Sequence, residues 1–234
     1  MTQRLWTAEA IVHAARPRKP ISQEPFLEDV RAGRASLPAI ALYVESMACM
    51  ADWLPRYLAQ LMAASPSRRL RLHMLENLME EEGFGAPEGR LTILEGRAHG
   101  ELARKTAAAL DPRPVAERPE GVSGRSLWVE RAIGQGRWPA AAAYLFAAWE
   151  GVSPEMCKAL LDGLRTHYQI AEKDLEYLAL HEELDVEHSR VGSELLAAEL
   201  ATEEEWRDAI AGARYGARAC HVWHAVVGRA AAKL

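Results

Sequence analysis

The sequence predicts an all-α protein, folded as a single-domain bundle of about seven helices. Ala is abundant, β-branched residues are sparse, and no segment alternates apolar and polar residues as strands do. Hydrophobic residues make up 49% of the 234-residue chain, which is enough to bury one sizeable core. We therefore expect residues 21–234 to form one helical domain, preceded by a flexible lead, residues 1–20, that ends in the basic segment ARPRKP.

Three helices are predicted before the middle of the chain. The first covers residues 36–63, with Ser36 as its N-cap and Pro38 in its first turn. The second covers residues 67–82 and ends where the segment GFGAP, rich in Gly and Pro, breaks the helical pattern. The third is expected over residues 90–110.

Residues 111–124 form a linker rich in Pro, Gly and charge. We interpret it as a long loop inside one domain, because neither half of the chain looks able to bury a core alone. Later in the chain, Ser153 followed by Pro154 is typical of an N-cap and a first helical turn. Helices are therefore expected over residues 125–133, 138–150, 153–165, 170–199 and 202–230.

Composition excludes several classes of function. The net charge is -5 and the pI is about 5.9, which argues against nucleic acid or an anionic membrane as a partner. The N-terminus has no secretory signal, and no apolar run reaches the length of a membrane span. Three widely separated cysteines, Cys49, Cys157 and Cys220, fit buried thiols in a reducing compartment. We expect a cytoplasmic protein.

The most informative segment is HEELDVEH, residues 181–188. On a helix, positions i, i+4 and i+7 share one face, so His181, Asp185 and His188 point the same way. Two imidazoles and a carboxylate suit a divalent metal of intermediate softness. The alternative is a polar surface stripe, since the whole segment is charged. The zincin motif is excluded, because it requires the second His four residues after the first.

Further ligand candidates lie on other predicted helices. Glu150 ends the apolar run AAAAYLFAAW, where a carboxylate needs a cation or strong donors unless it reaches water at the helix end. Glu81 ends the second helix and His99 lies in the next, so a hairpin could bring them together. Glu95 is a rival partner of His99, because the two are four residues apart. Spacing alone does not choose between Glu81 and Glu95.

Together, three carboxylates and three histidines from four helices suit a carboxylate-bridged site for two metal ions. A ferritin-like bundle would need two Glu-x-x-His copies, and the sequence has only the near match from Asp185 to His188. The chain instead resembles the haem-oxygenase-like di-iron oxidases and oxygenases, relatives of the thiaminase-like and pyrroloquinoline-quinone-synthase-like helical enzymes. The resemblance spans residues 36–200 and rests on ENLMEEEGFGAPEG (76–89), HGELARKTAAAL (99–110) and HEELDVEHSRVGSELL (181–196).

The resemblance implies a ligand set and an activity. The ligands would be Glu81, His99, Glu150, His181, Asp185 and His188. They would hold two Fe2+ ions, or Mn in their place, with O2 as co-substrate reduced to a peroxide between the metals. The implied reactions are desaturation, C–C cleavage or N-oxygenation in specialised metabolism. The implied substrate is a small molecule such as an amino acid, its derivative or a short carboxylate, and an external electron donor is compatible with this chemistry.

Two departures from the family pattern stand out. The stretch between Glu81 and His99 is longer than expected, with GRLTILEGRA as apparent extra residues, and this keeps Glu95 as an alternative ligand. A branch similar to the chlamydial para-aminobenzoate synthase has a Tyr beside the Glu of the fourth helix. Trp149 stands there in this chain, so we expect no self-sacrificial tyrosine chemistry.

The substrate pocket is predicted from apolar residues near these ligands, although each could equally be plain core. The predicted lining is Glu45, Met47, Met50, Trp53, Phe146 and Trp149. Two other functions remain open at this point: a metal-free enzyme of the thiaminase or quinone-cofactor-synthase type, for which Cys157 is the nearest nucleophile, and a non-catalytic helical interaction protein. A homodimer is the default expectation for the assembly.

Overall fold

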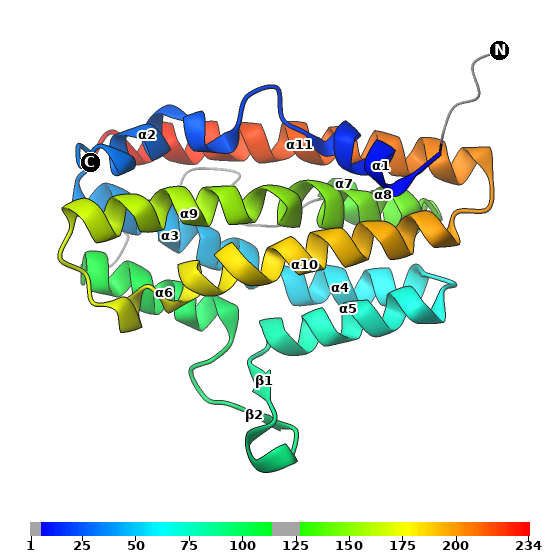
Figure 1. Ribbon diagram of the computed structural model, residues 1–234, viewed down its shortest axis with the longest axis horizontal. Helices are drawn as coiled ribbons and strands as arrows, with labels where there is room; N and C mark the ends of the chain where they lie inside the picture. Colours follow the sequence, from blue (N-terminus) through cyan, green and yellow to red (C-terminus); the bar gives the residue numbers. More distant parts are fainter. Residues whose placement is uncertain (1–5, 114–126) are drawn as a thin grey trace.

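The computed structural model describes residues 6–113 and 127–234 and is almost entirely helical (Figure 1). Its long helices run side by side, and a short hairpin projects from one side of the bundle. The all-α prediction is confirmed. The α-helices are α1 (Ala8–Ala15), α2 (Pro25–Arg31), α3 (Leu37–Ala51), α4 (Leu54–Ala64), α5 (Arg68–Glu81), α6 (His99–Leu110), α7 (Leu127–Gly134), α8 (Trp138–Ala143), α9 (Glu150–His167), α10 (Glu176–Glu199) and α11 (Glu203–Ala231).

Shorter elements connect these helices. Three are 3-10 turns, η1 (Ile21–Gln23), η2 (Pro87–Gly89) and η4 (Glu172–Asp174), and one is a π-helical segment, η3 (Tyr144–Trp149). The antiparallel strands β1 (Phe84–Gly85) and β2 (Thr92–Ile93) make the projecting hairpin. The predicted linker, residues 111–124, lies outside the described residues from position 114 onward.

Three predicted helices have different bounds in the structure. The helix predicted over 36–63 is divided into α3 and α4, because Pro55 in the first turn of α4 has no N–H for a continuous ladder. The predicted third helix starts only at His99, since residues 84–93 form the hairpin. The helices predicted over 138–150 and 153–165 are one continuous rod, in which α9 follows η3 directly and contains Pro154. Ser153 therefore lies inside α9 and is not an N-cap.

The N-terminal segment also differs from its prediction. Residues 8–15 form α1, which Thr7 caps and which packs along α11 and α10. Ile11 and Ala15 are fully or almost fully buried there. The prediction of a flexible lead is therefore wrong for α1, because its apolar face covers the bundle. Residues 1–5 lie outside the described residues.

The core consists of two apolar clusters. One lies between α2, α3, α6 and α9, and the other between α4, α5, α8 and η3, with α10 and α11 packing along both. Trp149, the last residue of η3, packs against both clusters. The residues predicted as ligands come from the helices that meet at this junction.

One stretch is long and apolar enough to cross a membrane by length and composition alone. It covers Leu37–Ala64, and 61% of its most apolar window is buried inside the bundle. The stretch is divided between α3 and α4. Its burial is that of a core element, which accounts for its hydropathy without a membrane.

Candidate metal centre

Helix α10 presents the predicted histidine–aspartate face to the interior. His181 and Asp185 are buried, and the His188 side chain is 12% exposed. The His181 Nδ1–H donates to the Tyr177 carbonyl at 2.8 Å, so its Nε2 is left as the free electron-pair donor. That Nε2 lies 3.9 Å from Glu81 Oε1. The surface-stripe alternative for this segment is thereby excluded.

Glu81 and His99 lie in contact, which is one of the two pairings that the sequence allows for His99. His99 Nδ1 lies 2.8 Å from Glu81 Oε1, and both side chains are buried. With His181, they form a cluster whose ligand atoms all lie within 4.8 Å of one another. Three such groups around one point can hold a single divalent ion.

The hairpin explains how α5 and α6 bring these two residues together. Gly83 has a φ of +74°, and a Cβ on it would lie 2.6 Å from the Ala98 nitrogen. Only glycine fits that turn and that approach. Leu94 N–H donates to the Gly83 carbonyl, which closes the hairpin just before α6 begins at His99. The extra residues of the sequence are therefore accommodated in the hairpin.

Glu95 does not reach the site. It lies exposed in the turn between β2 and α6, outside any helix. Its four-residue spacing from His99 therefore does not put Glu95 and His99 on one helix face. The prediction of Glu95 as an alternative ligand is wrong, because the helix that the spacing presupposed does not extend to residue 95.

Glu150, Asp185 and His188, the predicted ligands outside that cluster, would make the second half of the candidate site. Glu150 is the first residue after η3, and π-helical turns of this kind often occur at functional sites because they re-aim the side chains that follow. Its Oε1 accepts from Asn77 Nδ2 at 2.7 Å. His188 Nδ1 lies 3.7 Å from Asp185 Oδ1.

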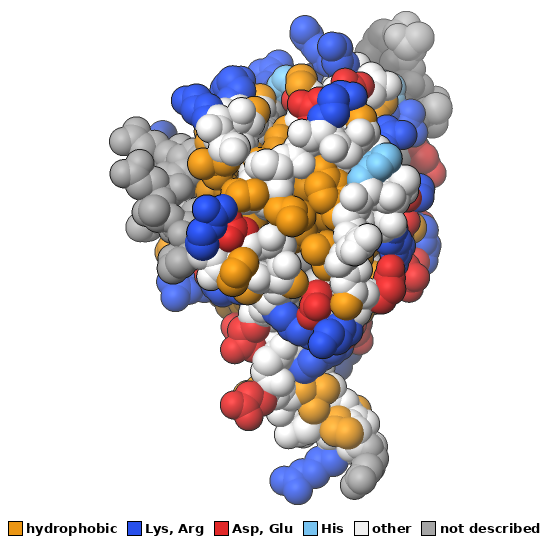
Figure 2. All heavy atoms as spheres, turned by 90° about the vertical axis from the view of Figure 1, so that its left-hand side faces the viewer, with side chains coloured by type: hydrophobic (Ala, Val, Ile, Leu, Met, Phe, Trp, Pro, Cys, Tyr) orange, Lys and Arg blue, Asp and Glu red, His pale blue; other side chains and the backbone are white. Residues whose placement is uncertain are grey.

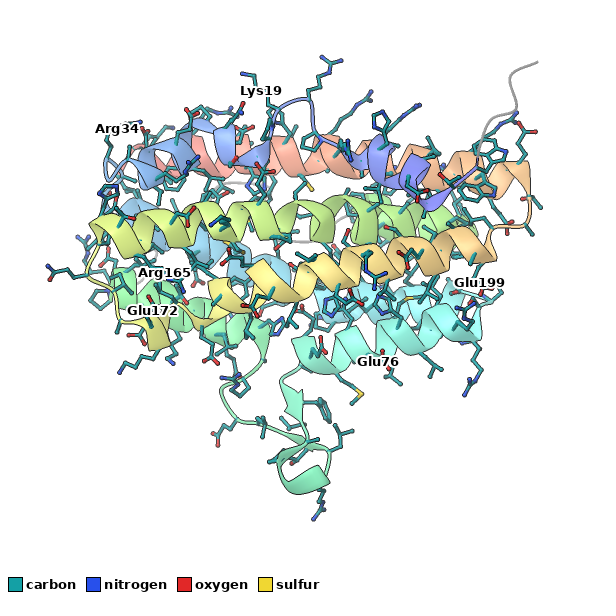
Figure 3. All side chains as sticks on the ribbon, in the orientation of Figure 1. Lys19, Arg34, Glu76, Arg165, Glu172 and Glu199 are labelled. Atoms are coloured by element: carbon teal, nitrogen blue, oxygen red, sulfur yellow. The ribbon has the colours of Figure 1, made fainter. Side chains whose placement is uncertain are left out.

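Sequence reasoning missed three polar residues on α5 that support this half. Asn77 holds Glu150, Glu80 Oε2 lies 2.9 Å from His188 Nε2, and the His73 ring packs against the His188 ring. Glu76 points away from the bundle (Figure 3). The spacing of 73, 77, 80 and 81 is that of one helix face, which is the signal that could have found them.

Electrostatics distinguish these buried groups from ordinary surface residues. Burial, reinforced by the nearby Asp185 charge, raises the pKa of Glu150 from 4.5 to about 8. Burial opposes the charge on His188, but the hydrogen bonds that its ring donates to the Asp185 and Glu80 carboxylates outweigh burial and raise its pKa to about 10. Burial likewise opposes the charge on His99, and Glu81 raises its pKa. A cation would have to displace protons from this cluster.

The donor set fits metal ions. Glu81 Oε2 and Glu150 Oε2 are buried without a hydrogen-bond partner. A buried carboxylate oxygen left unpaired costs free energy unless a cation or donor meets it. Two such oxygens on opposite halves of one His-and-acid cluster suit a pair of divalent ions held by nitrogen and oxygen ligands.

A cavity of about 100 Å³ opens beside the candidate ligands. Glu81, Glu150, His181 and Asp185 line one side of it, and the other side is mainly apolar and aromatic. Of the predicted pocket residues, Met47, Met50 and Trp149 line the cavity. No Lys or Arg lines it among residues 6–113 and 127–234.

The other three predicted pocket residues lie elsewhere. Glu45 contacts Arg104 at 3.7 Å, so its charge is matched between α3 and α6. Trp53 stacks on Tyr57 at the α3–α4 break and carries Arg56 over its ring. Phe146 is fully buried against His73 and the Gly192 backbone. None of these three residues lines the cavity, so their assignment to the pocket is wrong.

The fold and the site together define an all-α protein with a buried carboxylate–histidine cluster suited to metal. A family model described as an iron-containing redox enzyme matches residues 42–221. The chain therefore belongs to this family. This match confirms the family resemblance inferred from the sequence motifs. It also confirms the haem-oxygenase-like fold that the resemblance implies.

Solved structures are similar in fold. A TenA homolog from Pseudomonas syringae pv. tomato has a TM-score of 0.71 at 13% identity, covering 98% of this chain and 93% of its own. A CADD-like protein of unknown function from Nostoc punctiforme has a TM-score of 0.69 at 15% identity, covering 95% of this chain and 96% of its own. No curated protein matches the chain.

A first prediction concerns the metal-free protein. The raised pKa of Glu150 means that the folded state binds a proton more tightly than the unfolded state. Stability from this group is therefore full below about pH 4.5 and is lost as pH rises through about 8. Glu150→Gln removes this loss, and we expect the variant to exceed wild type by ~1–3 kcal/mol at pH 8.5 and to match it at pH 5.

Urea unfolding of chelator-treated protein at the two pH values measures the difference. The Gln amide can donate to the unpartnered Asn77 Oδ1, so the variant should fold normally. If the variant differs from wild type by the same unfolding free energy at both pH values, Glu150 is not held in a low-dielectric site.

Proposed function

We propose that this chain is a non-haem di-iron oxidase or oxygenase that uses O2 to oxidise a small molecule. The observation that carries the proposal is the buried cluster of Glu81, His99 and His181 beside Glu150, with one unpaired oxygen on each carboxylate. Membership of the iron-containing redox enzymes supports iron as the metal. Two ferrous ions would supply electrons for O2 reduction, and Mn is the alternative metal.

Each half of the cluster would hold one ion. Glu81, His99 and His181 would hold the first, and Glu150, Asp185 and His188 the second. The carbonyl of Tyr177 fixes the His181 tautomer with Nε2 toward the site. Asn77 orients the Glu150 carboxylate through its Oε1, which leaves Oε2 for a cation.

The cavity would hold the substrate beside these ligands. Its wall includes Met47, Met50, Leu54 and Met156, which suit an apolar part of the substrate and exclude water. We keep an amino acid, its derivative or a short carboxylate as the substrate class. Desaturation, C–C cleavage and N-oxygenation are the candidate outcomes, and cytoplasmic location, an external electron donor and a homodimer remain part of the proposal.

The test is anaerobic loading with Fe2+ followed by rapid mixing with O2. The proposal expects a stoichiometry of two iron ions per chain and a transient visible absorption after mixing. A candidate substrate should speed the decay of that absorption. Loading with Mn2+ in parallel identifies the preferred metal. A protein that takes up neither metal stoichiometrically would overturn the proposal.

Cys157 separates this proposal from a metal-free enzyme with a cysteine nucleophile. The thiol is fully buried, does not line the cavity, and burial raises its pKa well above the usual range. A reactive cysteine has the opposite environment. We expect Cys157→Ala to keep its iron content and its rate of O2-dependent iron oxidation within about twofold, at a stability cost of ~1 kcal/mol.

Iron analysis and stopped-flow absorption check this expectation. Cys49→Ala, which removes another buried thiol, is the matched control. Loss of activity in Cys157→Ala alone, with iron retained, would favour the thiol-dependent reading.

A further inference from the structure

A second hollow lies on the opposite side of α11 from the metal-site cavity. It has a volume of about 790 Å³ and is bounded by the loop between α1 and α2 and by one face of α11. Lys19 stands on that loop, above α11 (Figure 3). The two cavities share no lining residue. The hollow therefore requires its own explanation.

The lining of this hollow is strongly basic. Its cations come from two segments that face each other: Arg16, Arg18 and Lys19 from the loop, and Arg214 and Arg218 from α11. Lys and Arg side chains also protrude along the upper edge of the molecule in Figure 2, the edge that α2, α11 and this loop form in Figure 1. The arrangement concentrates positive charge in a concave site on a chain of net charge -5.

These five cations have no acidic partner among the described residues. Glu24 is the one carboxylate that lines the hollow, and its Oε1 is taken by His221 Nδ1 at 2.6 Å. Two other arginines pair with carboxylates of α11: Arg137 with Asp208 and Arg207 with Glu203. Like charges held together without counter-charges repel one another, and an anion is the partner that relieves this.

The shape and the remaining lining indicate which anion fits. The volume is that of a small-molecule site, and a concave site differs from the flat basic face that membranes or duplexes bind. Arg forks match phosphate oxygens in pairs and also stack on aromatic rings. Pro17, Ala217 and Val222 supply apolar surface beside them, and Val222 is 59% exposed. We propose that this hollow binds a nucleoside diphosphate or triphosphate.

The binding test uses ADP, pyrophosphate and adenosine with the full chain, by calorimetry in buffer of low ionic strength without divalent cations. We expect saturable binding of ADP, at least as tight as that of pyrophosphate, weakening as salt rises. Adenosine should bind far more weakly. Arg214→Gln/Arg218→Gln should weaken ADP binding about tenfold or more, because each lost Arg removes charge-assisted hydrogen bonds.

The matched control is Arg207→Gln/Arg229→Gln, which removes two exposed arginines from α11 outside the hollow. It should change ADP affinity less than twofold, about the scatter of the method. Circular dichroism confirms that both double variants stay helical. Absence of saturable ADP binding, an equal loss in both double variants, or tighter binding of pyrophosphate or adenosine than of ADP would each overturn the proposal.

Discussion

Replacing His181 with Ala is expected to reduce bound iron from two ions to one or fewer per chain and to abolish O2-dependent iron oxidation. His181 Nε2 faces Glu81 inside the cluster, while its Nδ1–H is committed to the Tyr177 carbonyl. Losing this nitrogen leaves Glu81 and His99 as a two-residue site, too few to hold a divalent ion firmly. Anaerobic titration with Fe2+, followed by iron analysis, measures the effect.

His13→Ala is the matched control for that variant. His13 is an exposed histidine on α1, far from the ligands in sequence and without a side-chain partner in the described residues. It should retain both ions. If His181→Ala binds iron like wild type while its helical content is intact, the imidazole is not a ligand and the proposed site is wrong.

The second large expected effect is structural. Gly212→Ala should destabilise the protein by roughly 2–3 kcal/mol and lower Tm by about 5–10 °C. A Cβ at this position would lie 2.0 Å from the Ala140 carbonyl oxygen. The obstacle is backbone, so α11 has to move away from α8. Because η3 and Glu150 continue directly from α8, we also expect weaker iron binding.

Gly134→Ala provides the comparison for this variant. Gly134 ends α7, and a Cβ there would meet nothing within 4 Å. The substitution should be neutral or slightly stabilising, because Ala restricts the unfolded chain. Thermal unfolding of both variants checks the contrast. Equal melting temperatures would show that α11 and α8 do not need their close approach.

Periodicity and capping predicted the parts of the fold that local chemistry determines. The Ser36 side chain accepts a hydrogen bond from the Ala39 N–H, as the predicted N-cap should, and α3 begins where the sequence places it. The face shared by His181 and Asp185 needed only helical spacing. These features depend on residues a few positions apart, so the sequence alone contains them.

Features that depend on distant partners were not predictable in this way. Glu45 looked unusual inside an apolar helix, and only the position of Arg104 on α6 explains it. The π-helical segment before Glu150, YLFAAW, packs against α11, and nothing in its own sequence marks it as π-helical. Asn77 was overlooked because its partner, Glu150, is 73 positions away along the chain.

Diffraction from crystals of the iron-loaded protein at the iron absorption edge tests the central claim most directly. We predict two anomalous peaks per chain, one among Glu81, His99 and His181 and one among Glu150, Asp185 and His188. Peaks located only at surface residues, or no iron peak in crystals grown from protein that binds iron in solution, would contradict the assignment.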